Sequence, residues 1–302
     1  MNSRPAGRAQ RAVSAGRAVR ARRLPRVHIA GLLTLTAAGL CAAVVLGAVS
    51  TLTLTATGLM PVVGEPRLST QAFAAVAPDL LLATRESLLI ATASTALAAT
   101  LGLTAAILVL SSTPGARLLT ALAAAPIPIA HIVAAASFAL LLSDAGLFNR
   151  LSSVDTSSWP ALVAGPWPVA SVAAFAWKES AFVALVVSAA IGPLLSAYAE
   201  TAALLGASPW QRTVRVLIPL ALPSLLGSSI IVFLYTLGSY EVVWLLGRAY
   251  PEPLPVTAYR LFTSVDLQAR PQAAAVALVG VLLALAAASA TVPLLRRIGV
   301  AR

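Results

Sequence analysis

Residues 87–110 read SLLIATASTALAATLGLTAAILVL and contain no Asp, Glu, Lys or Arg. A helix needs about 20 mostly apolar residues to cross the hydrocarbon core of a bilayer. An apolar run of about 10–14 residues is more typical of a helix buried in a soluble protein. The length of this run therefore predicts a transmembrane helix.

Five more apolar runs of similar length occur along the chain. Of its 302 residues, 59% are hydrophobic and 10% are charged, whereas about a quarter are charged in an ordinary soluble domain. A soluble fold of this composition would leave too much apolar surface in water. We therefore expect an all-α integral membrane protein with about six transmembrane helices. The other five runs are 29–54, 118–142, 169–192, 220–246 and 272–295.

The N-terminal segment is rich in arginine, with eight Arg within residues 4–26. A sequence pI near 11.3 would suggest nucleic acid as the partner of a soluble protein. However, no basic stripe with interleaved aromatic residues follows, and arginine beside a membrane is attracted to anionic lipid headgroups. We expect residues 1–28 to form a cytoplasmic arm at the lipid bilayer and to bind no nucleic acid.

The first apolar run, 29–54, could also belong to a signal peptide, because a basic segment precedes it. It exceeds the usual apolar core of about 7–15 residues, and no convincing small-x-small cleavage site ends it. We therefore expect a retained transmembrane helix over 29–54. A core of five further transmembrane helices is expected over 86–295, followed by a cytoplasmic tail at 296–302.

The distribution of basic residues predicts the orientation, because Lys and Arg are enriched in cytoplasmic loops. With a cytoplasmic N-terminus, the segments inside the cell hold 14 of the 21 Lys and Arg residues and the segments outside hold six. The remaining one is Lys178, which lies within the fourth run. Both termini are then cytoplasmic, as an even number of helices requires.

The loop between the fourth and fifth runs, residues 193–219, reads PLLSAYAETAALLGASPWQRTVRVLIP. Strong helix formers dominate residues 197–205, and Gly206 follows as a helix stop that accepts a left-handed backbone. Ser208 can cap the next helix, with Pro209 at its first position and Gln211 three residues after the cap. This pattern predicts two short helices joined by a turn.

The first of these helices has an apolar face, which could lie on the bilayer surface. A capped helical hairpin is nevertheless more than a connection between antiparallel helices requires, since a short turn suffices. Amphipathic helices commonly fit into a groove of a partner, so we interpret the hairpin as a docking element. The residues of the apolar face are Leu194, Leu195, Tyr198, Ala202 and Leu205.

The loop also carries a family resemblance. Glu200-Thr201-Ala202, then Gly206 six residues after the Glu, then Val216-Leu217-Ile218-Pro219 resembles the EAA loop of binding-protein-dependent ABC importer permeases. Thr201, Val216 and Ile218 depart mildly from the pattern, whereas the Gly and Pro offsets match. The resemblance extends more weakly over about residues 86–295, through Glu86–Ala91, Pro126–Ile129, Gly146–Asn149 and Trp177–Phe182.

This resemblance implies the fold of a type I ABC importer permease in a bacterial plasma (inner) membrane. It implies a second permease chain, identical or different, an extracytoplasmic substrate-binding protein, and a cytoplasmic ABC ATPase subunit that binds ATP and Mg. The hairpin would couple ATP hydrolysis in that subunit to transport. The implied coupling residues are Glu200, Ala202, Leu205, Gly206, Ala207, Ser208 and Pro209.

The chain has no ATPase site of its own, because a nucleotide-binding P-loop needs Gly-x4-Gly-Lys-Ser/Thr. Its one lysine, Lys178, follows Trp177, so we expect a transport subunit that is not an enzyme and holds no cofactor. We also expect no metal site, because Cys41, His28 and His131 lack partners at a metal-binding spacing.

Charged side chains within spans cost about 2.5–3.5 kcal/mol on insertion scales, so they usually pair or line water. Glu241 lies 22 residues after Pro219, which is about 33 Å along a continuous helix and near the outer mouth. It could attract a cationic substrate or simply be solvated at a helix end. Lys178 and the adjacent Glu179 do not share a helix face and could be structural. The candidate pathway residues are Glu241, Tyr240, His131 and Lys178.

The substrate is not readable from the sequence, although segments around residues 177–180 and 238–247 look most like the branch serving polyamines, thiamine, iron or phosphonates. Two other classes of membrane protein are alternatives. A six-helix secondary transporter would be expected to show paired broken helices in two halves, and no convincing repeat is present. An intramembrane serine protease is disfavoured because Pro209 follows Gly206-Ala207-Ser208 and no histidine is suitably placed.

Overall fold

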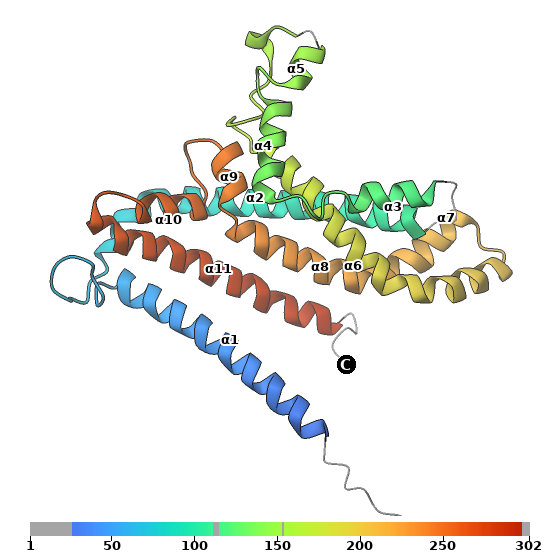
Figure 1. Cartoon of the computed structure of the whole chain (residues 1–302), viewed down its shortest axis with the longest axis horizontal. Helices are drawn as coiled ribbons and strands as arrows, with labels where there is room; N and C mark the ends of the chain where they lie inside the picture. The colour runs from blue at the N-terminus through green and yellow to red at the C-terminus, as the bar shows by residue number, and fades with distance from the viewer. Residues whose placement is uncertain (1–25, 111–114, 153, 298–302) are drawn as a thin grey trace, which may run out of the picture. The chain divides into compact units, whose positions relative to one another are not determined.

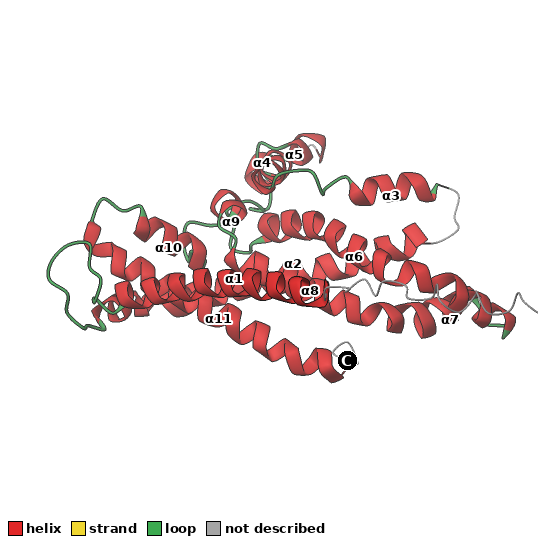
Figure 2. Ribbon diagram, turned by 60° about the horizontal axis from the view of Figure 1, so that its bottom comes forward, coloured by secondary structure: helices red, strands yellow, loops and turns green. Residues whose placement is uncertain are grey.

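The computed structural model describes residues 26–110, 115–152 and 154–297, and all regular secondary structure in these ranges is helical (Figure 2). Most of the expected N-terminal arm and the end of the expected tail lie outside them. The helices are α1 (Arg26–Ala56), α2 (Gln71–Leu110), α3 (Ala116–Ala124), α4 (His131–Leu142), α5 (Leu147–Ser152), α6 (Val169–Leu204), α7 (Pro209–Arg212), α8 (Ile218–Gly238), α9 (Glu241–Leu246), α10 (Leu254–Phe262) and α11 (Arg270–Arg297). Short helical turns are η1 (Thr156–Ser158), η2 (Thr213–Leu217, a π-helix) and η3 (Leu267–Ala269).

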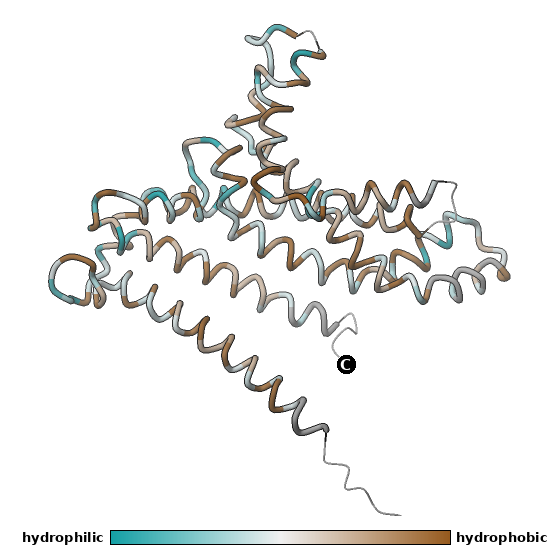
Figure 3. Tube along the Cα trace, in the orientation of Figure 1, coloured by the Kyte–Doolittle hydropathy of each residue, from teal (hydrophilic) through white to brown (hydrophobic). Residues whose placement is uncertain are grey.

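Six helical segments in the described ranges are long and apolar enough to cross a membrane, which confirms the predicted fold class. Hydrophobic residues occur along the length of these helices, whereas hydrophilic residues concentrate at the connections between them (Figure 3). The segments are Gly31–Ala56, Gln71–Leu110, His131–Ser152, Val169–Leu194, Pro209–Gly238 and Leu267–Thr291.

The chain divides into two compact units, residues 1–49 and 50–302. Within the first unit, the described part of α1 is apolar and its side chains are exposed, Leu35 and Leu40 by about 70%. Such a surface is compatible with lipid rather than water, since lipid chains are themselves apolar.

Helices α2 and α6 form the most extensive contact in the second unit, and α8 packs against both (Figure 1). Small residues recur every four positions on one face of α2, at Ser94, Ala98, Gly102 and Ala106, and all four are buried. They face branched side chains of α6 that follow the same spacing, namely Val183, Val187 and Ile191. Small residues let helix backbones approach closely in a membrane, where van der Waals packing drives association.

Two further clusters complete the core of this unit. One joins the first half of α2 to α10 and α11 through Val76, Leu254 and Val276. The other surrounds the fully buried Phe175 of α6 with residues of α4 and α9 such as Ala135 and Leu246. The second cluster holds α4 and α9 beside the first turns of α6.

The predicted single helix over 118–142 is wrong, because residues 125–130 separate α3 from α4. Pro126 and Pro128 lie in this break. A proline lacks the backbone N–H that a helix interior needs, and it disfavours the helical conformation of the preceding residue.

The predicted helix over 220–246 is also interrupted, since α8 ends at Gly238 and α9 begins at Glu241. Ser239 has an extended backbone with ψ 130°, so Glu241 does not continue the axis of α8 as the 33 Å estimate assumed. In contrast, the predicted span 169–192 and the first helix of the hairpin are one continuous helix, α6, which contains Pro193.

Helix α2 begins at Gln71, well before the predicted Ser87. Its 40 residues correspond to about 60 Å, roughly twice the hydrocarbon thickness of a bilayer. The charged residues Asp79, Arg85 and Glu86 belong to its first half. These charged residues limit the apolar run, but they do not mark the start of the helix.

Candidate functional site

The hairpin at the end of α6 consists of two long helices and a turn of four residues, 205–208. Helix α6 enters the turn, and α7, η2 and α8 leave it with almost no break in helical structure. Helix α6 continues for ten residues beyond Leu194, to Leu204, and these ten residues include Ser196, Glu200 and Thr201. The turn thus follows a stretch of α6 that contains polar residues as well as apolar ones.

The turn has the local structure that its residue types predict. Gly206 adopts a left-handed backbone with φ 77°, and the N–H of Ala207 donates to the carbonyl of Ala202 at 3.0 Å. This is the bond that closes a Schellman motif after a helix. The predicted helix stop at Gly206 is confirmed.

The second helix of the hairpin begins with the predicted capping box. The N–H of Gln211 donates to Oγ of Ser208, and the N–H of Ser208 donates to Oε1 of Gln211. Pro209 occupies the first helical turn. Both helix ends at the turn are thus capped, which defines the local structure of the hairpin.

Large apolar side chains are exposed around this turn. The exposed fractions are 89% for Leu204, 83% for Leu205 and 75% for Trp210. A cluster of exposed apolar residues marks an interaction surface. Of the predicted apolar face, Tyr198 and Leu194 are about half exposed, whereas the side chain of Leu195 lies outside the described part of the structure.

The predicted coupling residues Ala202, Leu205, Gly206, Ala207, Ser208 and Pro209 all fall in this hairpin. Glu200 lies in the last turns of α6, but its side chain is outside the part that the structure describes. The backbone places these residues together; their coupling role stays a prediction.

Replacing Ser208 by Ala should loosen the start of α7, because the N–H of Gln211 loses its acceptor. Loss of such a cap costs about 1 kcal/mol. Hydrogen exchange at the Gln211 amide should therefore accelerate, whereas Ser208→Asp should preserve the protection. Equal exchange in the Ala variant would show that the cap does not stabilise the turn.

A second surface, which we call the aromatic groove, lies beyond the opposite end of α8. It has a volume of about 530 Å³ and is lined by residues of the α4 start, α9, α10 and the adjoining loops. The rings of Tyr240 and Tyr259 are 4.3 Å apart between centroids, and Tyr240 stacks on Trp244 at 6.0 Å. The structure thus places two of the predicted pathway residues, Tyr240 and Glu241, in one groove.

The groove also contains an ion pair that sequence reasoning missed. Nε of Arg260 donates to Oε2 of Glu252 at 2.8 Å. Both residues, and Tyr259, belong to residues 247–271, the connection between the predicted runs 220–246 and 272–295, for which no helix was predicted. The amphipathic pattern of LPVTAYRLF at 254–262 is the signal that could have identified α10.

The loop between α9 and α10 is held by α2. Arg248 pairs with the buried carboxylate of Glu86, and the backbone N–H of Leu254 donates to Oγ of Ser87 at 2.8 Å. The hydroxyl of Tyr250 donates to Asp79 at 2.9 Å, and this hydrogen bond raises the pKa of the Tyr250 phenol. The first half of α2 therefore positions one wall of the aromatic groove.

Replacing Glu86 by Leu should destabilise the protein, because Arg248 keeps its charge without its partner. Breaking a buried pair in this way costs on the order of 3 kcal/mol, whereas replacing both members by apolar residues is often neutral. Thermal unfolding in detergent should thus show a marked loss for Glu86→Leu and partial recovery for Glu86→Leu with Arg248→Met. No recovery in the double variant would contradict this explanation.

His131 and Lys178 lie apart from the groove lining. Nε2 of His131 lies 2.8 Å from Oε1 of Glu179, and its ring is 4.8 Å from that of Tyr235 in α8. Lys178 is buried, and its Nζ donates to the carbonyl of Ile127 at 3.2 Å in the break between α3 and α4. These contacts give Lys178 a structural partner in the break between α3 and α4, and Glu179 one at the start of α4.

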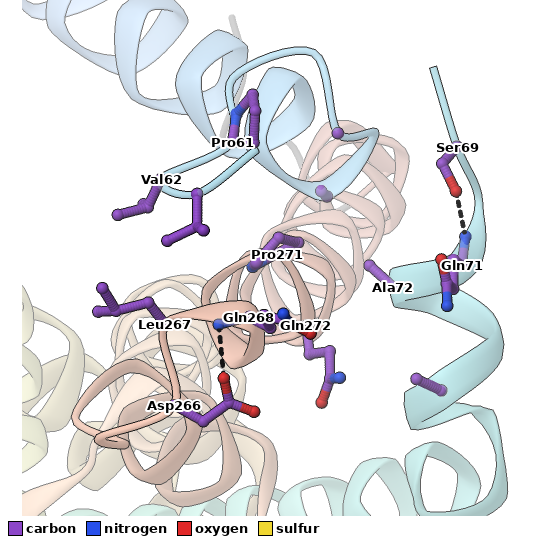
Figure 4. A pocket seen from close by; sticks show the side chains of 14 residues that line it. Pro61, Val62, Ser69, Gln71, Ala72, Asp266, Leu267, Gln268, Pro271 and Gln272 are labelled. Atoms are coloured by element: carbon purple, nitrogen blue, oxygen red, sulfur yellow. Dashed lines mark hydrogen bonds between the residues drawn. The ribbon is translucent and has the colours of Figure 1, made fainter. Parts of the chain in front are cut away.

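Another pocket, of about 280 Å³, lies between the loop after α1 and the start of α11 (Figure 4). Two of its polar side chains accept hydrogen bonds from backbone N–H groups. Oγ of Ser69 accepts from the N–H of Gln71, and Asp266 accepts from the N–H of Gln268 (Figure 4). These side chains act as caps of the adjoining helices. No group of three or more His, Cys, Asp or Glu that could hold a metal occurs in the described ranges.

Comparisons with known proteins bear on the fold as a whole. No family model matches the chain. The molybdenum transport system permease protein ModB of Azotobacter vinelandii is 34% identical over 74 residues, which are 24% of this chain and 33% of ModB. The match thus spans about a third of the length of this curated relative.

Solved structures show the same arrangement over most of the chain. A bacterial ABC transporter involved in the import of the acidic polysaccharide alginate gives a TM-score of 0.68 at 20% identity, covering 87% of this chain and 96% of that chain. The alginate transporter in complex with an alginate pentasaccharide-bound periplasmic protein gives 0.67 at 18% identity, covering 86% and 95%. An amino acid ABC transporter gives 0.57 at 19%, covering 76% and 99%.

The chain therefore has the fold of ABC importer permeases, and the resemblance expected from its sequence is confirmed at this level. The narrower branch serving polyamines, thiamine, iron or phosphonates is not confirmed.

Proposed function

We propose that this chain is the permease subunit of a binding-protein-dependent ABC importer and forms half of its substrate pathway. The observation that carries the proposal is the capped hairpin of α6 and α7, which presents Leu204, Leu205 and Trp210 to a partner. A cytoplasmic ATPase subunit would hold this hairpin in a groove, and its closure on ATP would move α6 and α8 as levers.

The continuity of the helices supports this coupling. Helix α6 contacts α2 along the small-residue face and continues without interruption into the hairpin. Movement of the turn would thus be transmitted through α7 and η2, and then along the 21 residues of α8, about 30 Å long, to the aromatic groove. A flexible connection at the turn would absorb the same movement.

The remaining parts of the proposal follow from this arrangement. The hairpin and both termini would be cytoplasmic, and the groove would face the outside of a bacterial plasma membrane. An extracytoplasmic binding protein would deliver the substrate, and a second permease chain, identical or different, would complete the pathway. ATP and Mg would be bound by the ATPase alone.

Purification of the chain with and without its partner subunits tests the proposal. The isolated chain in lipid should hydrolyse no ATP, whereas the complex isolated from native membranes should hydrolyse ATP and transport solute only when ATP is present. Transport by the isolated chain, driven by an ion gradient, would instead favour a six-helix secondary transporter.

A further inference from the structure

We propose that the aromatic groove binds an alkylammonium cation, which would make an organic cation the substrate class of the pathway. This inference rests on the proposed function, because a permease needs a site at which its substrate enters. It is carried by the combination of ring faces and net negative charge in one cavity.

The rings provide the first part of the argument. Tyr240, Trp244 and Tyr259 come from three successive parts of the chain and meet at centroid distances of 4.3 and 6.0 Å. Trp244 is 59% exposed and Tyr259 is 49% exposed, so both offer ring surface to a ligand. An ammonium group within about 6 Å of such rings is attracted by their electron-rich faces.

The charges provide the second part. The groove lining contains two carboxylates and one guanidinium, of which Glu252 and Arg260 pair with each other at 2.8 Å. Glu241 is exposed and forms no ion pair within the described ranges. The lining thus carries a net charge of about −1, which favours a cation over an oxyanion by simple electrostatic attraction.

The surroundings reinforce this preference. Ile132 lines the groove directly after His131, whose Nε2 lies 2.8 Å from Oε1 of Glu179. The carboxylate of Glu179 thus adjoins the residue that precedes Ile132 of the groove lining. The volume of about 530 Å³ accommodates a small amine with its hydration water.

The test is titration of the full-length chain in lipid nanodiscs with choline chloride, followed by tryptophan fluorescence and calorimetry. Sodium chloride serves as the ionic-strength control and sodium molybdate as the oxyanion. Choline should bind saturably and change the fluorescence, and Trp244→Phe should remove that change. Preferential binding of molybdate, or no saturable binding of choline, would overturn the inference.

Matched variants locate the site. Glu241→Gln should weaken choline binding about fivefold, the effect of losing one exposed ion pair. Tyr259→Ala should weaken it about fivefold or more through loss of a cation–π contact, with recovery in Tyr259→Phe. Glu65→Gln, an exposed acid in the loop before α2, should bind choline as the unmodified chain does.

Two further results distinguish failure of the cation-binding inference from failure of the proposed function. If these groove variants alter the association of two permease chains and not choline binding, the groove is a protein interface and the inference is wrong. If choline binds as described but no ATPase associates with the chain, the inference holds and the proposed energy source fails.

Discussion

Replacing Leu205 by Glu is expected to abolish ATPase association while leaving the chain folded and inserted. Leu205 is 83% exposed in the hairpin turn, so the change removes no internal packing. In a groove of the ATPase, however, the substitution would bury a carboxylate that has no counter-charge. The free-energy cost of burying such a charge far exceeds the free energy gained by burying leucine. We expect the affinity for the ATPase to fall at least about a hundredfold, which corresponds to about 3 kcal/mol.

The amount of ATPase activity that co-purifies with the tagged chain measures this effect. Leu68→Glu is the matched control, because Leu68 is also highly exposed, at 76%, but lies in the loop before α2. That variant should retain the activity. Equal loss in both variants, or no loss in Leu205→Glu, would mean that the hairpin is not the docking surface.

The second large effect is expected at the contact between α2 and α6. A Cβ atom added at Gly102 would lie 2.6 Å from Cβ of Val183 and 2.8 Å from the carbonyl oxygen of Ser180. Neither neighbour can rotate away, since one is backbone and the other is attached directly to it. Gly102→Ala should therefore separate the two helices and cost about 2–3 kcal/mol, the range of overpacked cores.

Thermal unfolding in detergent, compared across three variants, checks this expectation. Gly227→Ala in α8 is the control: no atom lies within 4 Å of its added Cβ, so the change should be neutral or stabilising by up to about 1 kcal/mol through helix propensity. Adding Val183→Ala to Gly102→Ala should restore little, because it removes Cγ1 of Val183, 2.7 Å from the added Cβ, but leaves the contacts with Cβ at position 183 and with the Ser180 carbonyl. Similar stability of the Gly102 and Gly227 variants would refute close packing of α2 on α6.

The parts of the fold that local chemistry determines could be predicted from the sequence. Length and hydrophobicity identify six helices that can span a membrane, and Gly206, Ser208 and Gln211 identify the hairpin turn, because a left-handed glycine and a capping box act over a few residues. The breaks at 125–130 and 239–240 were missed because hydrophobicity continues across them.

The aromatic groove could be predicted only in part. Tyr240 and Glu241 could be predicted from their place near the end of the apolar run 220–246, but Tyr259 and Arg260 come from a segment whose position depends on long-range contacts. The pairing of Glu86 with Arg248 spans 162 positions in sequence, and that of His131 with Glu179 spans 48. No local pattern specifies such partners.

Site-specific cross-linking from the hairpin tests the proposed coupling most directly. With Cys41 replaced by Ala, the chain has no other cysteine, so Ala207→Cys can carry a single photoreactive maleimide in native membranes. The cross-linked product should contain a P-loop polypeptide that is labelled by azido-ATP, and Leu68→Cys should yield no such product. Labelling of Ala207→Cys by an impermeant reagent from outside intact cells, or cross-links to no nucleotide-binding protein, would contradict a cytoplasmic hairpin driven by an ATPase.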